Sequence, residues 1–408
     1  MIAATIIMVA GVLLVALLSQ RAGYRLGGVM VLPLLAIYTF REPLSPVIFV
    51  AGTAAAWGAL WATREYTLNH GRRLFLIAVG VGALVTIAVG YALSQLLPAR
   101  LPFENAEMIA SIFPGVAAYN LMRLDPEDRP RDLLGMVVGY AALLAVGAVS
   151  LWLVEQTAWP TPPVLALPTS DLVFWLGFEP HGQGMPRLTP QWLTVSLLVV
   201  DVVAYEVVRK RYDHRLAGII AIPLLAVFSV RYGNAPLVYV LGATAVFFAL
   251  SFVHWVTLLY GRVLLGIALV AGSVYALLIG TLAPPATPGI TLFFIGLFTG
   301  IGAYNLHRVA PRDRTAHIRI SAAMFVAFYT VLLLIVDVPA SGLIDSVSPV
   351  YALLGGSVLA LGAVELYRLE QSIPDAGAFA RHSVFASVSV DGADAADSPL
   401  VDGREEDR

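Results

Sequence analysis

Two segments of the chain combine residue types that bind carboxylate or phosphate groups. Residues 119–129 and 304–314 both follow the pattern Tyr-Asn-Leu-x-Arg-x-x-Pro-x-Asp-Arg. Arginine can hold either anion through two parallel hydrogen bonds, and an asparagine amide can add a polar contact. Tyr119 and Arg123 are four residues apart and therefore share one face of a helix. The pattern predicts a substrate-binding or partner-binding site in each segment.

The same residues also suit an ordinary helix end at a membrane surface. A cationic side chain near a helix C-terminus complements the helix dipole, and Tyr is common where a membrane meets water. Asn120 can cap backbone carbonyls, and Asp128 can order the loop beside Arg129. Both interpretations stay open, and retention of the pattern in two segments favours the functional one.

Two further cationic positions also occur twice. Gly71-Arg72 recurs as Gly261-Arg262, and Arg25 recurs as Arg215. These residues can fix the orientation of the protein in the membrane, or they can form a basic ring that attracts an anion or an acidic partner. The predicted substrate- or partner-binding residues are Arg25, Arg72, Arg73, Tyr119, Asn120, Arg123, Arg129, Arg215, Arg262, Tyr304, Asn305, Arg308 and Arg314.

The sequence predicts no catalytic residue, no metal site and no cofactor. The chain has no Cys, and its seven His residues show no His-x-x-x-His spacing. No phosphate-binding loop, dinucleotide fingerprint or nucleophile elbow is present, and nucleic-acid binding is not expected. Asp201 lies in an apolar segment, where a carboxylate is a functional candidate, but its counterparts Gly11 and Ala360 show that it is not repeated.

The composition is that of a polytopic membrane protein. Hydrophobic residues make up 59% and charged residues 13% of the chain, whereas a soluble domain carries about 25% charged residues. A spanning helix needs about 20 apolar residues. We therefore expect an all-α fold with about thirteen transmembrane helices. The candidate segments are residues 2–19, 26–40, 45–62, 74–97, 107–122, 133–154, 191–208, 216–230, 235–257, 263–282, 290–306, 319–336 and 348–367.

These segments form a tandem repeat. Residues 25–36 recur at 215–226, and residues 113–129 recur at 298–314. The thirteenth segment shares features with the seventh and resembles the first helix of a third unit. The predicted units are a six-helix repeat at 1–157, an extracellular loop at 158–190 with a short interfacial helix at 170–178, a second six-helix repeat at 191–340, an additional transmembrane helix at 341–369 and a disordered acidic cytoplasmic tail at 370–408.

Basic residues predict the orientation. Loops after odd-numbered segments carry most of the Arg residues, whereas loops after even-numbered segments hold Arg41, Arg100, Arg187 and Arg231. The positive-inside rule places the odd loops in the cytoplasm, with the N-terminus outside and the C-terminus inside the cell membrane. An even number of helices per unit makes the two repeats parallel. The single Lys and the acid-rich tail hint at a halophilic source.

Two short segments in each unit carry residues that interrupt helices. Such segments can be broken or re-entrant helices that line a polar site. Re-entrant helices would move the basic loop at 64–73 to the outer side, so the charge distribution favours kinked spanning helices. The predicted helix-breaking residues are Pro33, Pro114, Gly115, Pro223 and Gly300.

Three motifs in order resemble a known family. They are Gly-Gly-Val-Met-Val-Leu-Pro at 27–33, His-Gly-Arg-Arg-Leu-Phe at 70–75 and Phe-Pro-Gly-Val-Ala-Ala-Tyr-Asn at 113–120. Together they resemble the integral-membrane C subunit of poly-γ-glutamate synthases, the PgsC/CapC family, here as a tandem duplication. The second copy departs from the pattern, with Val263 in place of the second Arg and Thr299 in place of the Pro.

The resemblance implies a non-catalytic membrane subunit that anchors a cytoplasmic ATP-dependent amide ligase, contacts other membrane-complex subunits and membrane lipid, and handles a polyanionic polymer for capsule synthesis or export. Parallel repeats with broken helices also suit a free-standing secondary transporter of a small anion. A membrane scaffold whose duplication serves only assembly is a third possibility. A ligase that co-purifies with the chain would favour the first interpretation.

Overall fold

The computed structural model describes residues 1–67, 71–96, 112–157, 161–165, 170–178, 189–212, 214, 216–283, 287–336 and 348–372. We call residues 1–157 repeat 1 and residues 191–336 repeat 2. Repeat 1 contains α1 (Ile2–Ala22), α2 (Val31–Arg41), α3 (Ser45–Tyr66), α4 (Arg72–Leu96), α5 (Phe113–Met122) and α6 (Arg129–Thr157). Repeat 2 contains α8 (Gln191–Tyr212), α9 (Ala221–Arg231), α10 (Ala235–Thr257), α11 (Gly261–Leu282), α12 (Gly289–His307), the 3₁₀ turn η2 (Pro311–Asp313) and α13 (Arg314–Ile335).

The predicted all-α polytopic membrane fold is confirmed. In the part of the chain that the structure describes there is no strand, and nine helices are long and apolar enough to cross a membrane. Of the other expected segments, α2 and α9 have 11 residues each, and α5 is described from Phe113 onward. The fourth, α8, has 22 residues and carries Asp201 and Glu206. A five-residue helix, α7 (Asp171–Trp175), lies in the loop between the repeats.

The segment at residues 26–41 crosses the bundle as an unwound stretch followed by a short helix. Its first end lies at the start of α6, where the backbone N–H of Leu26 donates to Asp132. Its other end lies beyond the far end of α6, where Arg41 donates to the carbonyl of Val164. Eleven helical residues rise only about 16 Å, about half of the hydrocarbon thickness. The chain therefore covers the remaining depth without helix.

Repeat 2 crosses in the same way. Ala217 bonds to Asn305 near the end of α12, whereas Asn234, after α9, bonds to Thr287 just before α12 begins. The segments at 26–40 and 216–230 therefore span the bundle as expected, but each does so as an unwound stretch followed by a short helix and not as one kinked helix. The re-entrant alternative is wrong for both segments, because each one enters at one end of the bundle and leaves at the other.

The proline positions explain why the helices begin where they do. Pro33 and Pro223 are the third residues of α2 and α9, and Pro114 is the second residue of α5. A first-turn proline loses no helical hydrogen bond, because N–H groups there have no intrahelical acceptor. Gly300 was predicted to break a helix, and this prediction is wrong, since α12 runs unbroken from Gly289 to His307. Gly300 instead allows close packing against the backbone of α11.

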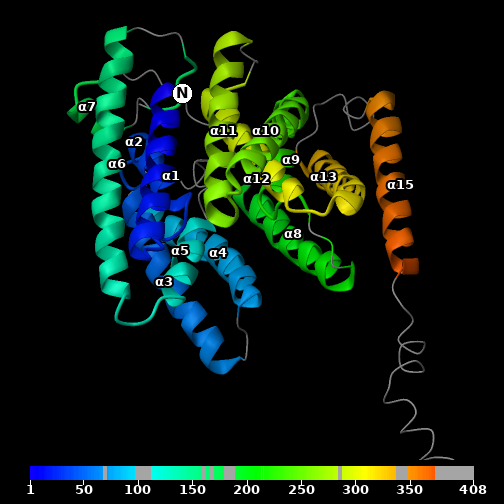
Figure 1. Cartoon of the computed structure of the whole chain (residues 1–408), viewed down its shortest axis with the longest axis horizontal. Helices are drawn as coiled ribbons and strands as arrows, with labels where there is room; N and C mark the ends of the chain where they lie inside the picture. The colour runs from blue at the N-terminus through cyan, green and yellow to red at the C-terminus, as the bar shows by residue number, and fades with distance from the viewer. Residues whose placement is uncertain are drawn as a thin grey trace, which may run out of the picture.

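The two repeats pack reciprocally. α1 of repeat 1 contacts α11 of repeat 2, and α8 of repeat 2 contacts α4 of repeat 1. Each unit thus offers its first and fourth helices to the other, as expected for like-facing units related by a two-fold operation. Figure 1 shows α11 beside α1 at the middle of the molecule, with α6 and α13 toward opposite sides.

The additional helix α15 (Pro349–Ser372) repeats a contact made by α1. It packs against α13, the last helix of repeat 2, as α1 packs against α6, the last helix of repeat 1. Arg319 of α13 donates to Glu365 of α15 at 2.6 Å. In Figure 1 this helix forms the edge of the molecule. The disordered tail was predicted to begin at residue 370, but α15 continues to Ser372. The rest of the predicted tail, from residue 373 onward, lies outside the described residues.

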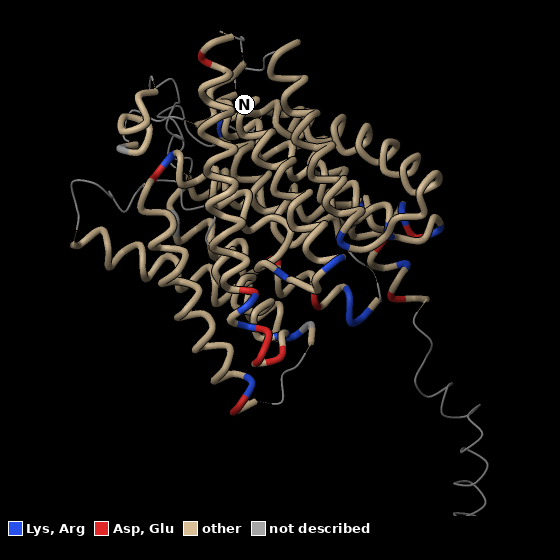
Figure 2. Tube along the Cα trace, turned by 60° about the vertical axis from the view of Figure 1, so that its left-hand side comes forward, with Lys and Arg blue, Asp and Glu red and all other residues tan. Residues whose placement is uncertain are grey.

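Charged residues gather at one end of the bundle. Figure 2 shows most of the Lys, Arg, Asp and Glu positions on the side away from the N-terminus. This end holds the loops that follow α1, α3 and α5 and their counterparts in repeat 2. It is the end that the positive-inside rule predicts to face the cytoplasm.

Close approach of α11 and α12 predicts a strict size limit at Gly272. A Cβ atom there would lie 2.1 Å from the carbonyl oxygen of Gly296, so Gly272→Ala should destabilise the protein by about 1–3 kcal/mol. Gly80→Ala in α4 is the matched control, because a Cβ at Gly80 meets nothing within 4 Å. Thermal unfolding of the purified protein in detergent measures both, and equal midpoints would contradict the packing.

Candidate functional site

The two Tyr-Asn-Leu-x-Arg segments end α5 and α12 in the same way. The hydroxyl of Tyr119 donates to the carbonyl of Gly71 at 3.1 Å, and that of Tyr304 donates to the carbonyl of Gly261 at 3.1 Å. Gly71 directly precedes α4, and Gly261 is the first residue of α11, so each acceptor lies at the start of the fourth helix of its repeat. The tyrosine therefore fixes the start of α4 or α11 against the fifth helix.

The asparagines hold the unwound crossing segments. Asn120 donates from Nδ2 to the carbonyls of Gly27 at 2.8 Å and Val116 at 3.0 Å. Asn305 donates to the carbonyl of Ala217 at 2.7 Å, the equivalent position of repeat 2. Inside a bilayer such carbonyls have no water to bond, so these amides satisfy groups that would otherwise be costly to bury. Both donor positions of the Asn120 amide are thus used within the fold.

The arginines of the motif divide into two kinds. Arg129 and Arg314 are half-buried, and each donates from Nε at 3.3 Å to the carbonyl five residues before it. Arg123 and Arg308 are exposed and lie over the rings of the tyrosines one turn earlier, at 5.8 and 5.5 Å from the ring centroid. The first pair orders the loop, and the second pair is available to an external anion.

Asp132 is a site residue that the sequence analysis missed. It is buried in the first turn of α6 and accepts the backbone N–H groups of Arg25 at 2.7 Å and Leu26 at 3.1 Å. Leu26 has φ of +49°, a left-handed conformation that is unfavourable for a leucine and needs such support. An acidic residue in a first helical turn is ordinary, and its counterpart in repeat 2 is His317, so neither pattern nor repetition could single it out.

Three guanidinium groups from both repeats converge beside this turn. Burial, together with the nearby charges of Arg123 and Arg262, lowers the pKa of Arg25, whereas Tyr119 and Asp132 act in the opposite sense. Arg25 and Arg262 line a cavity of about 40 Å³ between α1 and α11. Nη1 of Arg25 is buried without a hydrogen-bond partner. We call Arg25, Arg123 and Arg262 the guanidinium cluster.

The guanidinium cluster has the properties of an anion site. Arg123 and Arg262 each repel the charge of Arg25, and both are exposed at the end of the bundle. A carboxylate or phosphate would relieve the repulsion and supply the acceptor that Arg25 lacks. The cluster lies where the repeats meet, so each repeat supplies part of it.

Other predicted residues do not join this cluster. Arg73 is exposed at the start of α4, and Arg308 lies beside Tyr304. Arg215 and the side chain of Arg72 lie outside the described part of the chain. The structure thus separates the eleven predicted side chains that it describes into ties within the fold, a cluster at the repeat boundary and exposed cations.

Replacement of Asp132 should show how strongly the turn at Arg25 depends on it. Asp132→Ala leaves two backbone N–H groups without their acceptor and should lower the free energy of unfolding by about 2–5 kcal/mol. Asp132→Asn retains an acceptor oxygen and should cost less. Asp128→Ala, at an exposed position one turn earlier, is the control. Thermal unfolding in detergent should rank Asp132→Ala lowest, and stability equal to that of Asp128→Ala would contradict this role.

Comparison with known proteins identifies the repeated unit. A family model described as capsule biosynthesis CapC matches residues 10–130 and, a second time, residues 199–315. Searches of curated proteins and of solved structures found no match. The two matched stretches together cover more than half of the chain, and they fall on repeat 1 and repeat 2. This multi-pass membrane protein therefore belongs to the capsule biosynthesis CapC family and contains the family's unit twice.

Proposed function

We propose that this chain is a membrane subunit for the synthesis or export of poly-γ-glutamate or a similar polycarboxylate. It lies in the cell membrane with its N-terminus outside and its guanidinium cluster at the cytoplasmic end. A cytoplasmic ATP-dependent amide ligase docks at this end, and the growing polyanion contacts the cluster. The chain itself supplies binding and anchoring, and the ligase supplies the chemistry.

The guanidinium cluster is the observation that carries this proposal. A polymer with one carboxylate per unit can engage several arginines at once, which raises its effective affinity over that of a single carboxylate. Exposure of Arg123 and Arg262 leaves them accessible from the charged end of the bundle, while Arg25 lies deeper with an unpaired nitrogen. Family membership supports the capsule context, and the motif resemblance supports the γ-linked polymer.

A second candidate, a secondary transporter for a small anion, draws support from the crossing segments. Unwound backbone before α2 and α9 occurs inside transporters where a substrate binds near the midplane. In repeat 1, however, the carbonyl of Gly27 is already taken by Asn120, and in repeat 2 that of Ala217 is taken by Asn305. This favours a structural role for the unwound segments and leaves the cluster as the better binding site.

Neutral substitutions within the cluster should weaken polymer binding. We expect Arg262→Gln and Arg123→Gln each to lower the affinity for poly-γ-glutamate oligomers about tenfold at low salt, because each removes one charge-assisted contact. Arg312→Gln is the control, since Arg312 is an exposed arginine at the same end that pairs with Asp313. Calorimetry of the purified protein with the oligomers measures the affinity, and polymer output of the cells measures the consequence.

Arg308→Gln tests whether repeat 2 carries an equivalent site. Arg308 matches Arg123 by position and lies on Tyr304 in the same way. Unchanged binding and output in all three variants, with normal membrane levels, would support a scaffold. Anion flux in proteoliposomes without a co-purifying ligase would support the transporter.

A further inference from the structure

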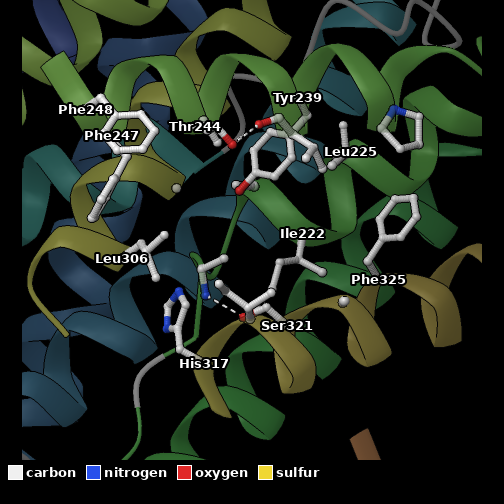
Figure 3. Close-up of a pocket in the computed structure, with 18 residues that line it drawn as sticks. Ile222, Leu225, Tyr239, Thr244, Phe247, Phe248, Leu306, His317, Ser321 and Phe325 are labelled. Carbon is white, nitrogen blue, oxygen red and sulfur yellow. Dashed lines mark hydrogen bonds between the residues drawn. The ribbon is translucent and has the colours of Figure 1, made fainter. Parts of the chain in front are cut away.

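Repeat 2 contains an apolar cavity between its helices. Its volume is about 320 Å³, within the range of small-molecule sites, and its walls come from α9, α10, α12 and α13. Figure 3 shows Tyr239, Thr244, Phe247 and Phe248 on one side and His317, Ser321 and Phe325 on the other, with Ile222 and Leu306 between them. The lining is almost wholly apolar, so the cavity suits a hydrocarbon ligand.

In repeat 1 the chain fills the equivalent space with its own side chain. Met136 packs against a cluster made by Val31, Phe49 and Ala117, and its methyl group lies within 3.1 Å of a Cβ built on Gly27. The counterparts in repeat 2 of Val31, Phe49, Ala117 and Gly27 all line the cavity; they are Ala221, Tyr239, Gly302 and Ala217.

The counterpart of Met136 is Ser321. Its short side chain accepts the backbone N–H of Ala217 at 2.9 Å and leaves the space beyond it open. Ala322, next to it, replaces Val137 of repeat 1. A flexible, unbranched apolar group therefore occupies this position in one repeat, and the other repeat has room for such a group to enter from outside.

The cavity opens toward the surface that faces lipid. Residues at its rim are strongly exposed, with Phe248 at 66%, Val240 at 55% and Ile318 at 53% of full accessibility. All three belong to α10 or α13, two helices long and apolar enough to span a membrane. A hydrocarbon chain in the bilayer thus has direct access.

Cationic and imidazole groups lie at the charged end of the cavity. The guanidinium carbon of Arg314 is 5.1 Å from the ring centroid of Phe247, which lines the cavity. The rings of His254 and His307 are 5.1 Å apart, and the ring of His307 is 6.1 Å from that of Phe247. The counterparts of the two histidines in repeat 1 are Arg64 and Met122. The combination of one arginine with two histidines therefore occurs in repeat 2 alone.

We propose that the cavity binds one acyl chain of an anionic membrane phospholipid. The acyl chain lies between α10 and α13 beside Ser321, and the headgroup phosphate lies against Arg314 with His254 and His307 around it. Charge complementarity favours entry of the headgroup at the end where Arg314 lies against the lining residue Phe247. This site is separate from the guanidinium cluster and does not depend on the proposed function.

A photoreactive phosphatidylglycerol with a diazirine in its acyl chain tests the proposal. The full-length protein is placed in vesicles that contain the probe, irradiated, digested and mapped by mass spectrometry. We expect adducts on α10 and α13 residues that line the cavity. Ala322→Leu narrows the cavity and should reduce these adducts about tenfold, as expected for the loss of contact with about two methylene groups.

Ala327→Leu is the matched control, because it adds the same bulk to an exposed position of α13 outside the cavity lining. Ala243→Leu, which adds bulk at a cavity-lining position of α10, is a second obstructed variant should Ala322→Leu fail to fold. Arg314→Gln should lower labelling by phosphatidylglycerol but not by a photoreactive diacylglycerol. Adducts that are absent from the cavity, or undiminished in both obstructed variants, would overturn the proposal.

Discussion

The need to satisfy backbone polar groups within the bilayer governs this structure. Each repeat sends one segment through the bundle with a helix of only 11 residues, so the unwound residues before that helix must find hydrogen-bond partners from other elements. Asn120 and Asn305 meet that need from the ends of α5 and α12. The tyrosines beside them tie the next turn in each repeat. The Tyr-Asn-Leu-x-Arg motif, which first suggested an anion site, therefore serves mainly to hold the unwound crossing segment in place.

The same constraint has been met differently where the repeats diverge. The turn before α2 is held by the carboxylate of Asp132, and the turn before α9 is held by the hydroxyl of Ser321. The carboxylate brings a negative charge close to Arg25, which partly offsets the repulsion from Arg123 and Arg262. The serine brings no charge and little volume, and a cavity lies beside it. The two repeats thus use different acceptors for backbone N–H groups before the short helix. Repeat 1 gains a negative charge there, and repeat 2 has a cavity beside its acceptor.

The sequence predicted the all-α membrane fold, the duplication and the paired motifs. Long apolar segments indicate spanning helices, and internal identity indicates that one unit occurs twice. It did not predict that α2 and α9 begin halfway through the bundle. Pro33 and Pro223 are equally consistent with a kink and with a helix start, and only the position of Gly11 against Pro33 shows at what depth the helix begins. Asp132 was missed for a similar reason, since its partners are backbone groups that leave no pattern in the sequence.

The guanidinium cluster depends on the packing of one repeat against the other. Arg25 and Arg123 come from repeat 1, whereas Arg262 comes from repeat 2, and they meet because α1 packs on α11. In a symmetric dimer the reciprocal contact of α8 with α4 would build an identical second cluster. The sequence retains Arg215, Arg308 and Arg72, the counterparts of the three cluster residues, and the side chains of Arg72 and Arg215 lie outside the described part of the chain. The boundary between the repeats is therefore nearly symmetric both in its packing and in the arginines that the sequence places there.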